Sequence, residues 1–168
     1  MRYLESFIIP SENRQVYHYK QMYDKGLEVI DFAPITIFYG SNNDSFYNVV
    51  KRKLFEKNDE ESNGETAIDY FKERLFSDNL YFLDEPENSM SPILQQELAS
   101  YICLLAYRLN CQFVLATHSP FMLSMQGARI YDLDSHPSVV REWWQLENMK
   151  VYYKLFERFS KRFNVSDR

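Results

Sequence analysis

The second half of the chain alternates between helix-like and strand-like hydrophobic patterns. Apolar residues recur at i, i+3 and i+7 within 65–76, which is typical of one helix face, and a short apolar run follows at Leu80–Leu83. A second helical pattern starts after Pro92 and stops at Asn110, and 112–117 is a continuous apolar run of the kind found in a strand covered on both faces. Helices and strands in alternation predict crossover connections, and therefore a mostly parallel sheet flanked by helices.

The first forty residues contain three strand-like runs, with a polar stretch between the first and the second. The segment 2–10 is rich in aromatic and branched residues, and two further short runs, Leu27–Phe32 and Ile35–Tyr39, are separated by Pro34. Gly40 ends the second run. We therefore expect an N-terminal antiparallel β portion, in which the last two runs form a β pair that feeds a loop.

The residues after 127 predict one more strand and a C-terminal helix. The strand covers Ala128–Asp134, and Trp143 and Trp144, which follow it, are interpreted as core or interface aromatics. The helix carries an apolar stripe of Tyr152, Leu155, Phe159 and Phe163 and a basic side of Lys154, Arg158, Lys161 and Arg162. We interpret the basic side as a solvated helix face, and a nucleic-acid contact is the alternative.

Length and composition fit one packed α/β domain. The chain has 168 residues, of which 45% are hydrophobic and 17% aromatic, whereas Gly and Pro number only 4 and 6. This composition argues against disorder and predicts a single domain over 1–168. The formal charge of -5 does not indicate a nucleic-acid partner, although it leaves a local basic patch open.

The cysteines and the lengths of the apolar runs indicate in which cellular compartment the protein is expected. Cys103 and Cys111 form no CxxC pair and have no histidine at metal-ligand spacing, which favours reduced thiols in the cytoplasm. Apolar runs in the middle of the chain fall short of the roughly 20 residues that a membrane span needs. We therefore expect a cytoplasmic protein without a membrane partner.

Two strand-like runs end on residues that can carry chemistry. The stretch LYFLDEPENS places Asp84 and Glu85 at the end of one run, and FVLATHSP places His118 at the end of the next. Ligands collect at the carboxyl ends of parallel strands, where all three side chains would project. An Asp there can hold Mg²⁺ through water, a following Glu can polarise an attacking water, and a neutral His can hydrogen-bond a terminal phosphate oxygen. The pattern favours a nucleotide and its metal.

Each of these features also has a purely structural interpretation. Asp84, Glu85 and the following proline could form a turn that caps the next helix. A single histidine at a strand end, such as His118, is commonly a satisfied core group. The order and spacing of the two stretches favour the functional interpretation over both.

The two stretches resemble a known family. LYFLDEPENS is similar to the Walker B strand of ATP-binding-cassette (ABC) ATPases, and FVLATHSP resembles the switch-histidine strand that follows it. The similar branch includes SMC, Rad50 and RecF-type proteins and many small bacterial AAA-labelled ATPases. The resemblance implies a P-loop NTPase-like ABC head with ATP and Mg²⁺ as cofactors. It also implies that Asp84 is the metal ligand and that Glu85 and His118 are catalytic.

A third stretch, SNGE, lies shortly before the acid pair. Ser62, Gly64 and Glu65 resemble the family's signature motif, in which Ser and Gly at a helix start grip the γ-phosphate held by the opposite subunit. Free N–H groups at a helix N-terminus attract phosphate, which supports that role. The same residues form a capping box with Ser62 as cap and Glu65 at its third position, and this alternative stays open.

The phosphate-binding loop departs from the family pattern. GxxxxGK[ST] should begin at Gly40, yet an ungapped alignment places Ser45, Phe46 and Tyr47 at the last three motif positions. Phe46 has no donor where the lysine should stand. Charge-assisted hydrogen bonds contribute roughly 1.5 to 3 kcal/mol each, so we expect nucleotide binding to be weakened about 10- to 100-fold.

The chain is also abbreviated between 41 and 61, where the family places a long helix, a further subdomain and the Q-loop. Either the protein is naturally shortened or a segment is absent from this sequence. We expect little or no ATP hydrolysis by the chain alone, and a head-to-tail homodimer or heterodimer with an ABC-type subunit in which Ser62 and Gly64 complete the partner's site. The alternative is a non-enzymatic scaffold on the same fold.

Overall fold

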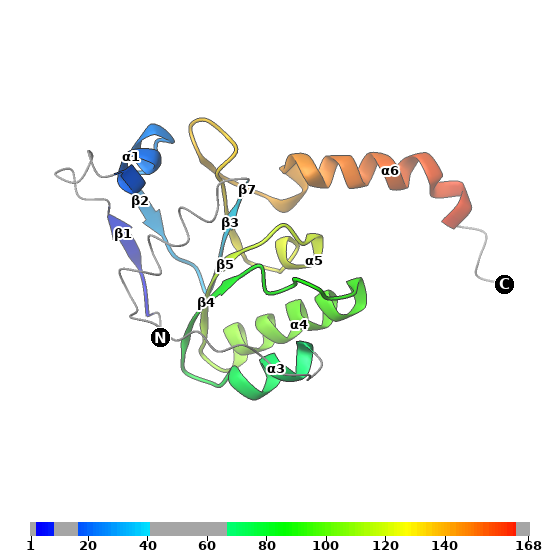
Figure 1. Ribbon diagram of the computed structural model, residues 1–168, viewed down its shortest axis with the longest axis horizontal. Helices are drawn as coiled ribbons and strands as arrows, with labels where there is room; N and C mark the ends of the chain where they lie inside the picture. The colour runs from blue at the N-terminus through cyan, green and yellow to red at the C-terminus, as the bar shows by residue number, and fades with distance from the viewer. Residues whose placement is uncertain (1–2, 9–16, 41–66, 164–168) are drawn as a thin grey trace.

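The computed structural model describes residues 3–8, 17–40 and 67–163. A five-stranded sheet forms the centre, with helices α3, α4 and α5 on one face and a small two-stranded sheet with helix α1 on the other (Figure 1). The fold class predicted from the sequence, α/β with a mostly parallel sheet and an N-terminal antiparallel portion, is confirmed and is consistent with a P-loop NTPase-like fold.

The central sheet has the strand order β4-β5-β3-β6-β7. Its strands are β4 (Leu80–Asp84), β5 (Gln112–Ala116), β3 (Ile35–Tyr39), β6 (Arg129–Asp132) and β7 (Val139–Arg141). The first four run parallel, and β7 pairs antiparallel with β6. The strand that ends at Asp84 is thus separated from the strand that ends at Tyr39 by β5 alone.

The helices connect and cover the strands. They are α1 (Tyr17–Asp24), α3 (Ala67–Arg74), α4 (Pro92–Arg108), α5 (Pro120–Leu123) and α6 (Glu147–Phe163), with a 3-10 helix, η2 (Trp143–Gln145), before α6. Helix α4 begins where the sequence predicts, because the Ser91 side chain caps Leu94 N–H and Pro92 occupies the first turn. None of the helices described here combines the length and the hydropathy that a bilayer crossing requires.

Alternating side chains of β3 fill two separate cores. Ile35, Ile37 and Tyr39 face the core beneath α3, α4 and α5, whereas Phe38 faces the core shared with α1 and β2. Because both faces of the strand are covered, β3 is buried along its whole length. This explains the continuous apolar runs of the central strands.

The predicted pairing of the two N-terminal runs is wrong. Strand β2 (Val29–Asp31) pairs antiparallel with β1 (Ser6–Ile8), while β3 enters the parallel sheet between β5 and β6. The chain changes sheets at Pro34, whose carbonyl accepts a hydrogen bond from Phe113 N–H at 2.8 Å. A residue without an N–H, placed between two strands, ends one ladder and starts another.

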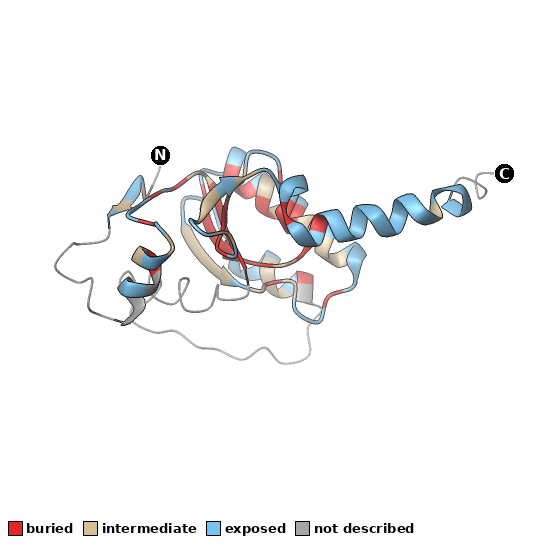
Figure 2. Cartoon of the chain, turned by 90° about the horizontal axis from the view of Figure 1, so that it is seen from above, coloured by how far each residue is buried: buried red, intermediate tan, exposed pale blue. Residues whose placement is uncertain are grey.

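Helix α6 is present as predicted, but it projects from the body (Figures 1 and 2). Of its 17 residues, all described in the structure, Met149 alone is buried. The predicted apolar stripe on this helix is therefore largely open to solvent.

Candidate functional site

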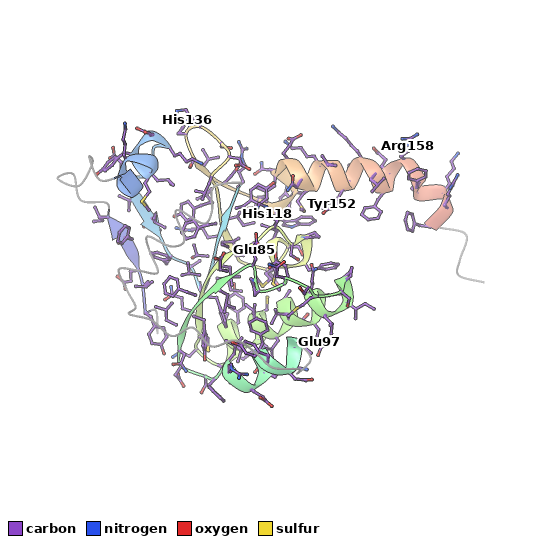
Figure 3. All side chains as sticks on the ribbon, viewed as in Figure 1. Glu85, Glu97, His118, His136, Tyr152 and Arg158 are labelled. Carbon is purple, nitrogen blue, oxygen red and sulfur yellow. The ribbon has the colours of Figure 1, made fainter. Side chains whose placement is uncertain are left out.

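The acid pair and the histidine lie at the same edge of the central sheet. Asp84 pairs in register with Ala116, the last residue of β5, and His118 follows two residues later. Parallel pairing thus brings the loops after β4 and β5 together, as predicted, and Figure 3 shows Glu85 and His118 at this edge. Asp84 is exposed, whereas Glu85 and His118 are half-buried.

The backbone of Glu85 is held in a conformation that side chains other than glycine rarely adopt. Its φ is 40°, in the left-handed region. The Glu85 N–H donates to Ala116 O at 2.8 Å, and the Glu85 carbonyl accepts from Asn88 N–H at 2.9 Å, so both backbone groups hold this turn. Left-handed conformations of this kind cost about 1 kcal/mol or more and cluster at functional sites.

A third acid, Glu87, joins the two loops. Its Oε1 accepts a hydrogen bond from the Thr117 hydroxyl and further bonds from His118 N–H at 3.2 Å and Ser119 N–H at 3.1 Å. Three donors on one carboxylate oxygen form charge-assisted bonds across the gap between the strands. Glu87 therefore fixes the backbone that carries His118.

The network continues into the neighbouring helices. The Ser119 hydroxyl donates to Gln95 Oε1 at 2.8 Å, and Gln95 Nε2 donates to Met90 O at 3.0 Å. Ser119 also caps α5 by accepting a bond from Met122 N–H. The loop with His118 is thus held by both β4 and α4.

One polar atom of this network has no partner. Glu87 Oε2 is buried and forms no hydrogen bond with any residue that the structure describes. A buried acceptor of this type costs about 1 to 3 kcal/mol unless a water or another donor reaches it. The carboxylate of Glu87 is therefore incompletely satisfied at the candidate site.

The His118 ring packs against an aromatic residue from the adjacent strand. The rings of Tyr39 and His118 meet edge-on, with centroids 5.4 Å apart. Burial raises the pKa of Tyr39 above its usual value, the nearby carboxylates of Asp134, Asp132 and Glu147 raise it further, and a hydrogen bond from the backbone of Asn148 acts in the opposite direction. Tyr39 therefore remains a neutral hydroxyl at physiological pH.

Gly40 has a structural reason to be glycine. Its φ is 141°, and a Cβ there would lie 3.0 Å from Asp134 Oδ1 and 3.1 Å from Leu133 Cβ. The chain after β3 thus passes too close to the end of β6 for any side chain. This close approach accounts for the glycine without a phosphate.

The predicted Mg²⁺ role of Asp84 fits the chemistry of the described residues. Within 3–8, 17–40 and 67–163 no group of three or more His, Cys, Asp and Glu side chains could hold a metal ion. Magnesium, however, is normally bound by one or two carboxylates together with waters and substrate phosphates. An exposed Asp84 at a strand end suits that mode of binding.

The structure brings together only part of the predicted site. Asp84, Glu85 and His118 gather at one edge, and Gly40 ends the strand on the far side of β5. Ser62, Gly64 and Glu65, like the loop 41–61, lie outside the described residues. Sequence reasoning missed Glu87 and Thr117, although Glu87 is visible as the third acid of DEPE and Thr117 as the residue before His118.

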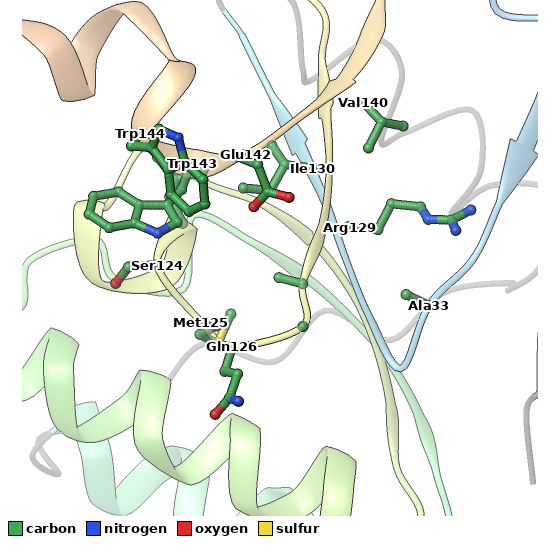
Figure 4. Close-up of a pocket in the computed structure, with 13 residues that line it drawn as sticks. Ala33, Ser124, Met125, Gln126, Arg129, Ile130, Val140, Glu142, Trp143 and Trp144 are labelled. Atoms are coloured by element: carbon green, nitrogen blue, oxygen red, sulfur yellow. The ribbon is translucent and has the colours of Figure 1, made fainter.

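A pocket of about 590 Å³ lies elsewhere, at the amino ends of β3 and β6 (Figure 4). Its lining includes Arg129, Glu142, Trp143 and Trp144, and none of the acids or the histidine of the candidate site contributes to it. The two indole rings meet edge-on at 5.9 Å, and Trp144 is 57% exposed. Of the two roles expected for these tryptophans, their exposure excludes a place in the core, and a role at an interface stays a prediction.

Comparison with known proteins assigns a family resemblance to the part of the chain that holds the site. No curated protein matches the sequence. Residues 74–124, which run from the end of α3 through β4, α4 and β5 to just beyond α5, match a family described as "AAA domain, putative AbiEii toxin, Type IV TA system". AAA-type families generally bind ATP and Mg²⁺. The segment that contains Asp84, Glu85 and His118 is thus similar to an AAA domain.

Proposed function

We propose that this chain is an ABC-type relative of AAA/P-loop ATPases that works in a composite nucleotide site or as a regulatory partner. The observation that carries the proposal is the register of Asp84 with Ala116, because it places Asp84, Glu85 and His118 at one edge of the sheet. The same residues lie inside the segment similar to an AAA domain.

Each residue has a distinct role in this proposal. ATP with Mg²⁺ would supply the phosphoryl group and the charge neutralisation at this edge. Asp84 would hold the hydrated metal, Glu85 would accept the proton of an attacking water, and His118 would donate a hydrogen bond to a terminal phosphate oxygen. Glu87 keeps the backbone of His118 in place through three hydrogen bonds.

The loop after Gly40 does not have the lysine with which the family binds the triphosphate. Phe46 stands where the family has lysine, and Tyr47 stands where it has the Ser or Thr that binds Mg²⁺. We therefore propose that Ser62 and Gly64, with Glu65 beside them, complete a site whose phosphate loop belongs to another subunit, in a head-to-tail arrangement.

A nucleotide titration and an ATPase assay on the purified chain test this proposal. We expect weak binding of a fluorescent ATP analogue with Mg²⁺ and no hydrolysis above background by the chain alone. Stimulation of a co-purified ATPase should be lost in Ser62→Ala, because Ser62 would complete the site on the partner's phosphate loop, and Glu85→Gln tests hydrolysis by the chain alone. Glu73→Gln is the matched control, because Glu73 is an exposed acid on α3, away from the strand ends. Hydrolysis by the isolated chain that disappears in Glu85→Gln would contradict the proposal.

A scaffold role is the second candidate function, and the uncovered apolar side of α6 favours it. Large exposed apolar surfaces on a helix mark contacts with other chains. If nucleotide neither binds nor affects any partner while complexes still form through α6, the scaffold role replaces the composite site.

A further inference from the structure

Helix α6 carries a regular seam of large apolar residues. Counting from Met149, the spacing alternates three and four residues over the whole helix, which is the a and d pattern of paired helices. The seam positions are Met149, Tyr152, Phe156, Phe159 and Phe163. Met149 is the one seam residue that is buried against the rest of the described chain. The seam continues beyond it along the part of α6 that no other described element covers.

The uncovered part of the seam is large enough to be an interface. Phe156 and Phe163 are 54% and 63% exposed, and the centroids of their rings are 5.7 Å apart. With Leu155, Phe159 and Arg162 they line an apolar groove of about 350 Å³. At roughly 100 Å² of exposed surface for each half-exposed aromatic, the seam offers on the order of 400 Å². Two such seams alone fall below a standard interface, so a stable pair also needs contact between each α6 and the other body.

The charges of α6 make this helix basic within an acidic protein. Five Lys and Arg and two Glu give the helix a net charge of +3, which leaves -8 for the rest of the chain, because the whole carries -5. The guanidinium groups of Arg158 and Arg162 both lie over the ring of the seam residue Phe159, at 5.4 and 5.3 Å from its centroid. The basic helix would therefore favour the acidic body of another copy.

The base of α6 adjoins the candidate site. Leu146 and Met149 are buried in the core that contains Tyr39, and the backbone of Asn148 contacts the Tyr39 hydroxyl. Tyr39 in turn packs on His118. Asp134 and Glu147 are both exposed at this base. A chain that binds to the base of the seam would therefore lie beside the carboxyl ends of the strands, where the acidic residues are.

We propose that α6 is the arm of a homodimer, pairing antiparallel with α6 of a second copy so that the basic end of each arm lies beside the acidic site edge of the other. If the two antiparallel helices are centred near Phe156, Arg162 of one arm lies opposite the first turn of the other arm. It is then next to Asp134 and Glu147 of that copy. This deepens the proposed function, on which it rests for a site shared by two chains, by naming the surface that joins them.

Sedimentation of the full chain without nucleotide tests the pairing. The wild type dimerises as its concentration rises, and Phe156→Glu weakens the dimer on the order of 100-fold, because it buries an unpaired carboxylate in the seam. Val151→Glu is the matched control: it introduces the same charge at an exposed residue of the same helix, off the seam, and leaves the dimer intact. Circular dichroism verifies that both variants fold. A monomer at all concentrations, or a dimer insensitive to Phe156→Glu, overturns the proposal.

Disulfide trapping tests the direction of pairing. In an antiparallel pair centred near Phe156, Leu155→Cys crosslinks to its copy and Ser160→Cys does not. Crosslinking through Ser160→Cys overturns the antiparallel arrangement. A monomer whose α6 binds oligo-dT, with loss in Phe156→Glu, assigns the surface to nucleic acid and overturns the dimer. A dimer that forms through the seam without affecting any ATPase supports this inference while contradicting the proposed function.

Discussion

The hydroxyl of Thr117, at the end of β5, donates a hydrogen bond to the carboxylate of Glu87 in the loop after β4. Thr117 is fully buried, and the same carboxylate oxygen also holds His118 N–H and Ser119 N–H. The contact ties the acid-bearing loop to the histidine-bearing loop. The geometry of the candidate site therefore depends on two residues that would not themselves touch a nucleotide in the proposed function.

Removing the Thr117 hydroxyl should loosen this link. We expect Thr117→Val to lower the free energy of unfolding by about 2 kcal/mol, because it removes a buried hydrogen bond to a charged group while keeping the shape of the side chain. Urea denaturation measures the loss. Thr117→Ser, which keeps the hydroxyl, should lose clearly less, and equal stability of Thr117→Val and wild type would show that the bond contributes nothing.

Gly40 offers a test of close packing at the end of β3. Gly40→Ala should destabilise the protein by about 2 to 3 kcal/mol, because the new Cβ meets Asp134 and Leu133 at a φ that L residues rarely adopt. Thermal and urea unfolding give the comparison. Gly127→Ala is the control, because the nearest atom to its Cβ is the hydroxyl of Tyr107, at the end of a side chain that can move. We expect about 1 kcal/mol there, and an equal loss at both sites would contradict the backbone argument.

The strong periodic patterns of the sequence predicted the central elements well. β3 has the predicted bounds, β4 differs only by including Asp84, and α4 begins at Pro92 because Ser91 caps it. The sheet edge that gathers Asp84, Glu85 and His118 followed from strand order alone. β3 was predictable because it is buried on both faces, and α4 because its cap is clear.

Other features depended on three-dimensional packing. The partner of β2 is β1 rather than β3, and the periodicity of a three-residue strand holds too little information to specify its partner. Strand β7 is equally short and was not predicted. Asp84, Glu85 and Glu87 are equivalent acids in the sequence, and only the turn at Glu85 determines that Glu87 points to the loop after β5.

The pKa of Tyr39 predicts a change in stability at alkaline pH. Because burial raises the pKa of Tyr39 above the usual tyrosine value of about 10, the unfolded chain loses this proton before the folded chain does. Stability is therefore unaffected by this group below about pH 10 and falls as the pH rises from there through the folded pKa. Tyr39→Phe keeps the ring against His118 but cannot ionise.

The measurement is the free energy of unfolding of wild type and Tyr39→Phe from neutral to strongly alkaline pH. The difference between the two proteins should be constant up to about pH 10 and then shift in favour of Tyr39→Phe. Tyr23→Phe, which removes the hydroxyl of a half-buried tyrosine away from the site, is the control. Parallel curves for wild type and Tyr39→Phe over the whole range would contradict the effect of burial.

The left-handed conformation of Glu85 predicts that a glycine at this position is more stable than an alanine. Glu85→Gly and Glu85→Ala both remove the carboxylate, but only glycine adopts a φ of 40° without a steric cost. We therefore expect Glu85→Gly to be more stable than Glu85→Ala by about 1 kcal/mol. Urea unfolding of the two variants measures the backbone cost directly, since their side-chain losses are nearly the same. An alanine variant as stable as the glycine variant would mean that the turn after β4 relaxes freely, and that Glu85 is not held in a strained conformation by its bond to Ala116.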